Sequence, residues 1–418
     1  MTNRFFFHLL QLRQRLWAKP LLYCLVAVAA VFLAHLADQW PVGQFLPEID
    51  EGTIQTLLTI ISSSMLAVAT FAVGSMLQAY GAASSSATPR ALTLILADDV
   101  SQTALSSFIG AFIFSIVAIV ALKTGLYGRG GLFILFALTL SIFAWVVLTF
   151  VRWVDNIARL GRLESTITKV EAAAAKSLTA RRRMPFLGGV EKTDSNSLDG
   201  RKIFCPDIGY VQYVDMNSLQ GLAEEHGLKI MLEAMPGSFL APGRPLVILD
   251  TPFDIDEALR ARIADAFVVG SSRTFEEDPR FGLVVLSEIA ARALSPAVND
   301  MGTAIAIVGR FVRLFARWAE PVEQEDRTIG KYDRIIVPGL SLADMFDDAF
   351  TAIARDGAGS VEVGIRLQKA LRALSNLDQP EMQEQAKRHS TLALQRAKAG
   401  LAMKDDFSRI QSLAEAFD

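Results

Sequence analysis

The stretch "TIQTLLTIISSSMLAVATFAVGSMLQAY" (Thr53–Tyr80) decides the class of fold. It lies in a run that contains no Asp, Glu, Lys or Arg between Glu51 and Arg90. A helix that crosses a membrane needs about 20 consecutive, predominantly apolar residues. The run is longer than this, so we predict a transmembrane helix over Thr53–Tyr80.

Three similar runs predict further spans over Pro20–Ala37, Val100–Leu122 and Gly131–Val151. Residues 1–152 are therefore predicted to form a four-helix transmembrane domain. The composition supports this prediction, since 51% of the 418 residues are hydrophobic and only 20% are charged. The sequence DQWP follows the first span where a signal peptide would have a small-residue cleavage site, which argues against a signal peptide.

The basic residues predict the orientation of these spans, because cytoplasmic loops carry an excess of Lys and Arg. The first loop contains acidic residues and no basic ones, whereas basic residues precede the first span and follow the fourth. We therefore predict a bacterial inner-membrane protein with both termini in the cytoplasm. Lys123 and Arg129 oppose this assignment, because they fall in a loop predicted to lie outside. The supporting residues are Arg4, Arg13, Arg15, Lys19, Arg152, Arg159, Arg162 and Arg181–Arg183.

The second span carries a stripe of small and hydroxylated residues. They recur every three or four positions and therefore share one helix face. This face is predicted either to line a pore or substrate path, or to pack closely against another helix, since small residues let membrane helices approach each other. The stripe consists of Thr56, Thr59, Ser63, Ala67, Thr70, Gly74 and Gln78, and Gly81 continues it.

The rest of the chain is predicted to be a cytoplasmic α+β domain that ends in a helical bundle. Residues 153–200 read as a basic helical stalk and linker, residues 201–340 as an α/β domain, and residues 341–418 as a helical region. Pro236-Gly237 and Pro242-Gly243 indicate tight turns between short strands. His389 is predicted to be an exposed helix residue.

The segment "DPRFGLVVLSEIAARALSPAVNDMGTA" (Asp278–Ala304) predicts two helices joined by a corner. Asp278 is suited to cap the first helix, and the residue before a proline is pushed out of helical geometry, so that helix should end before Ser295-Pro296. Asn299 or Asp300 is suited to cap the second helix. Arg292 is expected to pair with Asp278 or Asp300. The alternative is a ligand or coupling site, in which Arg292 and helix N-terminal amides hold an anion. The candidate residues are Asp278, Arg292, Ser295, Pro296, Asn299 and Asp300.

Three blocks give the chain a family resemblance. They are "TPRAL" after the second span, "GYVQYVD" (Gly209–Asp215), and "DPRFGLVVLSEIAARALSPAVND". Together they resemble the signature of bacterial predicted membrane proteins classed as domain of unknown function 2254. Thr88 stands where that family usually has Ser, and Met301 where it commonly has Pro. The resemblance implies the layout of the fold and an inner-membrane location, and it supplies no activity.

The function predicted from the sequence is a homo-oligomeric, channel-like or transport-associated membrane protein with a cytoplasmic regulatory domain. The alternative is a non-conducting sensor or scaffold whose cytoplasmic half binds a ligand or partner. No motif for catalysis, a cofactor or a metal is found, so we expect no enzyme activity. The net charge of −3 argues against nucleic-acid binding. The expected partners are membrane lipids, further copies of the chain, and a small anion or a protein at the cytoplasmic domain.

Overall fold

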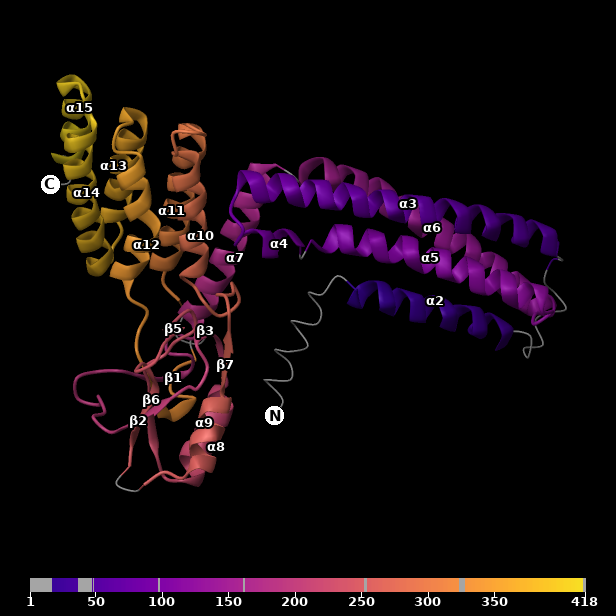
Figure 1. Ribbon diagram of the computed structural model, residues 1–418, viewed down its shortest axis with the longest axis horizontal. Coiled ribbons are helices and arrows are strands. Elements are labelled where there is room, and N and C mark those ends of the chain that lie inside the picture. The colour runs from indigo at the N-terminus through magenta and orange to yellow at the C-terminus, as the bar shows by residue number, and fades with distance from the viewer. Residues whose placement is uncertain are drawn as a thin grey trace. The chain divides into compact units, whose positions relative to one another are not determined.

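The computed structural model describes residues 17–36, 47, 49–96, 98–160, 162–251, 254–322 and 328–415. The described chain divides into two compact units, of which one ends at Thr166 and the other begins at Ile167. We call them the N-terminal unit and the C-terminal unit (Figure 1).

The N-terminal unit is helical. Its elements are α2 (Ala18–Leu36), α3 (Glu51–Ser86), α4 (Leu92–Leu96), α5 (Asp99–Lys123) and α6 (Arg129–Leu160). The four segments Ala18–Leu36, Glu51–Ser85, Leu92–Lys123 and Arg129–Arg159 are long and apolar enough to cross a membrane, as the sequence predicts. With 36 residues, α3 is about 54 Å long at about 1.5 Å per residue, which exceeds the roughly 30 Å hydrocarbon core of a bilayer.

The central helix of this unit is α5, which packs against α2, α3 and α6. Its buried side chains are mostly small, and they include Gly110, Ala111 and Ser115. A Cβ added at Gly110 would lie 3.2 Å from the Cβ of Tyr23 on α2. Small residues thus allow the close approach of helices in this unit, as is usual in membrane bundles.

Polar contacts near the two ends of the helices connect α2, α5 and α6 of the N-terminal unit. At one end, Lys19 pairs with Asp99, and the Asn156 side-chain amide donates to Asp98 at 2.7 Å. At the other end, the Tyr127 hydroxyl donates to the carbonyl of Val31 at 3.0 Å. These contacts join the start of α2 to the start of α5 and the end of α6, as an antiparallel bundle requires.

The C-terminal unit begins with most of α7 (Leu163–Arg183) and continues into two sheets and two helices. The five-stranded sheet has the order β1-β8-β4-β6-β2, and the three-stranded sheet has the order β5-β3-β7. The strands are β1 (Gly189–Glu191), β2 (Arg201–Phe204), β3 (Gly209–Val214), β4 (Lys229–Leu232), β5 (Phe239–Leu240), β6 (Pro245–Asp250), β7 (Phe267–Gly270) and β8 (Tyr332–Val337). The helices are α8 (Met216–Glu225) and α9 (Glu257–Asp265).

Local chemistry explains the turns between these strands. Gly227, Gly237 and Gly243 have φ values of 65°, 91° and 87°, a region that side chains disfavour. The last two lie in the predicted Pro-Gly turns.

Residues 188–200 were predicted as part of a linker, and the structure places β1 there, paired in parallel with β8. A partner that follows more than 140 residues later leaves no local signal.

The remaining helices form a bundle in which they stand side by side (Figure 1). They are α10 (Phe281–Ala293), α11 (Met301–Ala319), α12 (Leu342–Asp356), α13 (Val361–Ser375), α14 (Pro380–Gly400) and α15 (Lys404–Glu415). Phe311, Phe315, Phe346 and Phe350 pack ring to ring in its core.

The prediction that His389 is exposed was wrong. His389 is 2% exposed. The centroid of its ring lies 5.6 Å from that of Phe346 and 6.1 Å from that of Phe350. Burial lowers the pKa of His389 to about 4, although Asp347 acts in the opposite direction. Histidine suits such a position because its neutral ring packs like an aromatic residue.

Two contacts join α7 to this bundle. A Cβ added at Gly282 of α10 would lie 2.4 Å from the Cβ of Ala174, so the two helices meet where neither has a large side chain. The carboxylate of Glu171 binds Arg310, and it accepts hydrogen bonds from Arg313 at 2.8 and 3.0 Å. Burial raises the pKa of Glu171, but the hydrogen bonds from these arginines outweigh it, and the net shift is downward.

Candidate functional site

The first candidate site is the stripe on α3. All seven of its predicted residues are exposed in the single chain, and a Cβ added at Gly74 would have no neighbour within 4 Å. The buried residues of α3, among them Leu58, Met65 and Ala72, lie on the side that faces α5 and α6. At about 100° per residue, that side is opposite to the stripe. The stripe therefore faces away from the other helices of its own unit.

Large apolar side chains flank the stripe on both sides. Ile60 and Phe71 lie along one edge and Leu66, Val73 and Leu77 along the other, and all five are exposed. The stripe thus runs between two rows of larger apolar residues. Its hydroxyl groups donate to carbonyls one turn earlier in the same helix, at 2.7 to 2.9 Å for the residues Thr56, Thr59, Ser63 and Thr70.

The second candidate site is the corner between α10 and α11, where local caps hold the chain. The first helix ends at Ala293, and the Ser295 hydroxyl donates to the carbonyl of Arg292 at 2.7 Å. Asn299 has a φ of 52°, which asparagine tolerates better than most residues. Asp300 caps α11 by accepting from the amide of Thr303 at 3.0 Å. The predicted break and the predicted cap are confirmed.

The prediction that Arg292 pairs with Asp278 or Asp300 was wrong. The carboxylate of Asp278 is held by Arg273, and that of Asp300 by the amide and hydroxyl of Thr303, while Arg292 is an exposed residue. The 13 residues of α10 span about 20 Å, so Asp278 lies at one end of this helix and the corner at the other. The six candidate residues therefore do not form one site.

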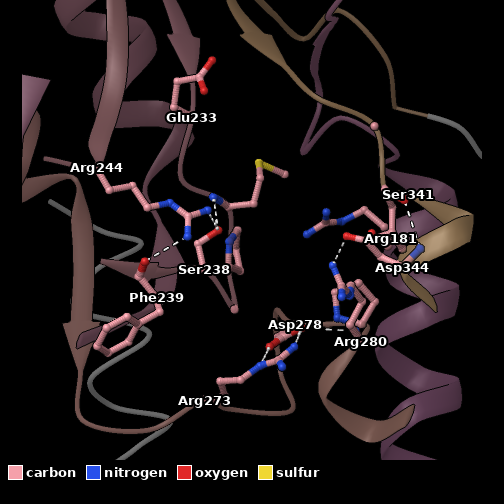
Figure 2. A pocket seen from close by; sticks show the side chains of 16 residues that line it. Arg181, Glu233, Ser238, Phe239, Arg244, Arg273, Asp278, Arg280, Ser341 and Asp344 are labelled. Carbon is pink, nitrogen blue, oxygen red and sulfur yellow. Dashed lines mark hydrogen bonds and ion pairs between the residues drawn. The ribbon is translucent and has the colours of Figure 1, made fainter. Parts of the chain in front are cut away.

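Asp278 instead lines a cavity of about 370 Å³ within the C-terminal unit (Figure 2). The wall is formed by the β4–β5 and β5–β6 turns, the segment before α10, the start of α12 and the end of α7. A Cβ added at Gly237 would lie 2.3 Å from Asp278 Oδ2. The glycine thus lets the β4–β5 turn approach the carboxylate and closes this side of the cavity.

The Asp278 carboxylate joins two parts of this wall. It is 2% exposed and accepts from Arg273 Nε at 2.6 Å and Nη2 at 3.0 Å. Its Oδ1 also accepts from the amides of Arg280 at 3.1 Å and Phe281 at 3.2 Å. Asp278 thus accepts from backbone amides at the start of α10, but the prediction that it is the N-cap was wrong, because α10 begins at Phe281 rather than at Pro279 and its N-cap is Arg280.

The other carboxylates of the wall are likewise occupied by cations. Glu233 accepts from Lys192 at 3.0 Å. Asp344 binds Arg280, which also donates to Asp348 at 2.6 and 3.2 Å. Each carboxylate that lines the cavity is thus in an ion pair, and Arg280 is shared between Asp344 and Asp348.

Two arginines of the wall have no carboxylate partner among the described residues. Arg244 donates to the carbonyl of Phe239 at 3.0 Å and to the Ser238 hydroxyl at 3.3 Å. Arg181 is 5% exposed and donates to the carbonyl of Glu277 at 3.2 Å. Burial lowers the pKa of Arg181, against the attraction of Glu277 and Asp278. Figure 2 shows Arg244 and Arg181 reaching into the cavity from opposite sides.

Sequence reasoning found Asp278 and missed this cavity. Arg181 belongs to a basic triplet that predicts the orientation of the spans and a basic helical stalk, and Arg244 follows one of the predicted Pro-Gly turns. The lining residues run from Arg181 to Asp344. The one signal available was an arginine next to a tight turn, which is common on protein surfaces.

The four long apolar helices and the folded unit after them are the features of a predicted multi-pass membrane protein. The family model described as "Predicted membrane protein (DUF2254)" matches residues 13–373, so the chain belongs to this family, whose function is unknown. The resemblance in the sequence is thereby confirmed.

Relatives exist in mycobacteria. Uncharacterized proteins of Mycobacterium bovis and Mycobacterium tuberculosis are 31% identical to this chain over 159 residues. The aligned stretch is 37% of this chain and 29% of each relative. The match thus spans less than a third of the length of these relatives. No solved structure matches the chain.

Proposed function

We propose that the protein is a homo-oligomeric, channel-like or transport-associated membrane protein in which copies of α3 meet through the hydroxylated stripe. The observation that carries this proposal is the exposure of the stripe on the side of α3 opposite to its own bundle. A face of Ser, Thr, Ala and Gly between rows of larger apolar residues suits the close approach of a second helix.

The composition of the span favours a passive path over coupled transport. No Asp, Glu, Lys or Arg lies between Glu51 and Arg90. Proton relays and ion-coupled transporters normally carry ionisable residues within their spans. Hydroxyl groups around an oligomer axis would provide hydrogen-bonding partners for water without a fixed charge. The C-terminal unit would then lie in the cytoplasm and regulate the path.

One observation favours the second candidate, a non-conducting sensor or scaffold. The hydroxyls of Thr56, Thr59, Ser63 and Thr70 already donate to carbonyls of their own helix. Such hydroxyls do not need water, and they would be equally stable in a dry helix–helix interface. In this second candidate the stripe is a dry helix–helix contact and the cytoplasmic half binds a ligand or partner, whereas in the first candidate water enters the stripe.

Cysteine cross-linking tests the subunit contact. In a background with Cys24→Ser and Cys205→Ser, Gly74→Cys in membranes should form disulfide-linked dimers on mild oxidation. Leu148→Cys is the matched control, because Leu148 is 61% exposed on α6 and away from the stripe. If neither variant forms dimers, or both do so equally, α3 is not the subunit contact.

Thiol accessibility then separates the two candidates. Single cysteines at Thr56, Ser63 and Thr70 should react with a small membrane-impermeant reagent if the stripe lines a water path. Leu58→Cys should not react, because Leu58 is fully buried against the other helices. Cross-linking at Gly74 without reaction at the hydroxyl positions would support the non-conducting scaffold.

A further inference from the structure

The wall of the cavity in the C-terminal unit contains two arginines that are in no ion pair with a residue that the structure describes. Asp278, Glu233 and Asp344 each have a cationic partner, whereas Arg181 and Arg244 have no carboxylate partner among the described residues. The hydrogen bonds of these two arginines go to neutral oxygens. Two arginines of the cavity wall therefore take part in no ion pair within the described part of the chain, although Glu277 and Asp278 attract Arg181 at longer range.

The burial of Arg181 indicates that its lack of an ion pair with any described residue has a functional cause. Arg181 is only 5% exposed and has lost most of its hydration, and buried charges are normally paired. An arginine kept only for packing could be replaced by an apolar residue of similar length. Its place in the wall of an open cavity, facing Arg244, indicates instead that the missing charge comes from a ligand.

We propose that this cavity binds a phosphate-bearing anion between the guanidinium groups of Arg181 and Arg244. Planar guanidinium groups bind phosphate oxygens in a bidentate manner. A phosphate monoester carries a charge of about −1.5 to −2 at neutral pH and three acceptor oxygens, which suit two arginines outside any described ion pair better than the single charge of a carboxylate does. The volume of about 370 Å³ lies within the range of about 300–1,000 Å³ for small-ligand sites.

The start of α12 adds to this site. Ser341 caps the helix and lines the cavity together with Gly339 and Leu340. The N-terminus of a helix carries a partial positive charge and suits phosphate. Asp344 lies in the first turn and opposes this effect, although it pairs with Arg280, which also binds Asp348. The two arginines thus remain the principal determinants of binding.

Equilibrium dialysis with labelled inorganic phosphate tests the proposal on the full chain in a detergent that lacks phosphate. Chloride at equal ionic strength serves as the reference. Glycerol 3-phosphate and a soluble short-chain phosphatidic acid are then used as competitors. Stronger competition by the lipid would identify a lipid headgroup as the ligand, and stronger competition by glycerol 3-phosphate a free phosphate ester.

Two variants and a control test whether Arg181 and Arg244 hold the phosphate. Arg244→Gln and Arg181→Met should each weaken phosphate binding by about tenfold or more, as expected for the loss of a charge-assisted hydrogen bond. Arg262→Gln should bind like the unmodified chain, because Arg262 is paired with Glu225 on the surface.

The response of Tm to phosphate separates a ligand site from a structural role. Arg181→Met also removes the attraction of Glu277 and Asp278 for the guanidinium, so the Tm of this variant without phosphate serves as its own reference. Phosphate should raise the Tm of the unmodified chain and leave that of Arg181→Met unchanged. The proposal fails if none of the three phosphate compounds binds, or if both arginine variants bind like the unmodified chain. Neither result depends on whether α3 forms the subunit contact.

Discussion

Replacing Asp278 by Asn provides a test of the wall of the cavity. The substitution removes the negative charge of a residue that is 2% exposed and holds the guanidinium of Arg273 through two hydrogen bonds. The amide oxygen of Asn can still accept from the amides at the start of α10. The variant therefore separates the loss of charge from the loss of the cap.

The expected destabilisation follows from the burial of the pair. Removing one partner of a buried ion pair costs about 3–5 kcal/mol, whereas losing an N-cap costs about 0.5–2 kcal/mol. The Arg273 side chain is 19% exposed, so water can reach it in part and the lower end of the first range applies. In a unit of about this size, 1 kcal/mol changes Tm by about 2–4 °C. We expect Asp278→Asn to lower Tm by about 6–12 °C.

A double-mutant cycle refines this test, with thermal unfolding of the detergent-solubilised chain as the assay. Arg273→Met should partly rescue the stability lost in Asp278→Asn, because the double variant lacks both charges of the ion pair. Asp300→Ala is the control for a cap without an ion pair, and its effect should stay within about 0.5–2 kcal/mol. Strictly additive effects of Asp278→Asn and Arg273→Met would refute the idea that the two charges stabilise each other.

Three further predictions concern packing, protonation and topology. Gly282→Val should destabilise the C-terminal unit by about 1–3 kcal/mol, because its Cβ would lie 2.4 Å from that of Ala174, whereas Gly309→Ala, whose nearest neighbour would be 3.7 Å away, should be tolerated in the same thermal assay. His389 is neutral when folded, with a pKa lowered to about 4 from 6.5, so the unfolded chain binds the extra proton. Stability is then intact above pH 6.5 and falls as the pH drops toward 4, and urea unfolding of His389→Gln at several pH values should show a weaker fall. Reporters fused to the C-terminus and inserted between the first two spans should give opposite compartment signals, and a C-terminus outside the cytoplasm would overturn the predicted orientation.

Local chemistry made part of this fold predictable. The four long helices follow from runs without charged residues. The predicted bounds of the first agree with the structure to within two residues, whereas the fourth continues to Arg159 instead of ending at Val151. The cap at Asp300 was predictable because its side chain accepts from a backbone amide only three residues later in the same segment. The Pro-Gly turns at Gly237 and Gly243 were found for the same reason, since a positive φ is a property of one residue.

Features that depend on distant segments were not predictable in this way. Arg273 lies only five residues before Asp278, but the residues between them form neither a helix nor a strand, so no periodicity indicated this pair. His389 lies in a polar helix, and its burial depends on Phe346 and Phe350 of α12. The cavity brings Arg181 and Arg244 together from segments more than 60 residues apart. No single segment contains the pattern of an anion site.

The position of Arg181 relates the proposed ligand to the connection between the two units. Arg181 lies near the end of α7, which follows α6, the fourth apolar helix, after residues 161–162. The same helix is bound to the bundle through Glu171 and through Ala174 at Gly282. An anion held by Arg181 would therefore bind to the segment that links the C-terminal unit to the last apolar helix. Because a ligand shifts a conformational equilibrium only by its difference in affinity between two states, regulation through this segment requires that α7 change its position in the cavity wall. Phosphate-dependent protection of α7 amides in hydrogen exchange, absent in Arg181→Met, is the observation that such regulation requires.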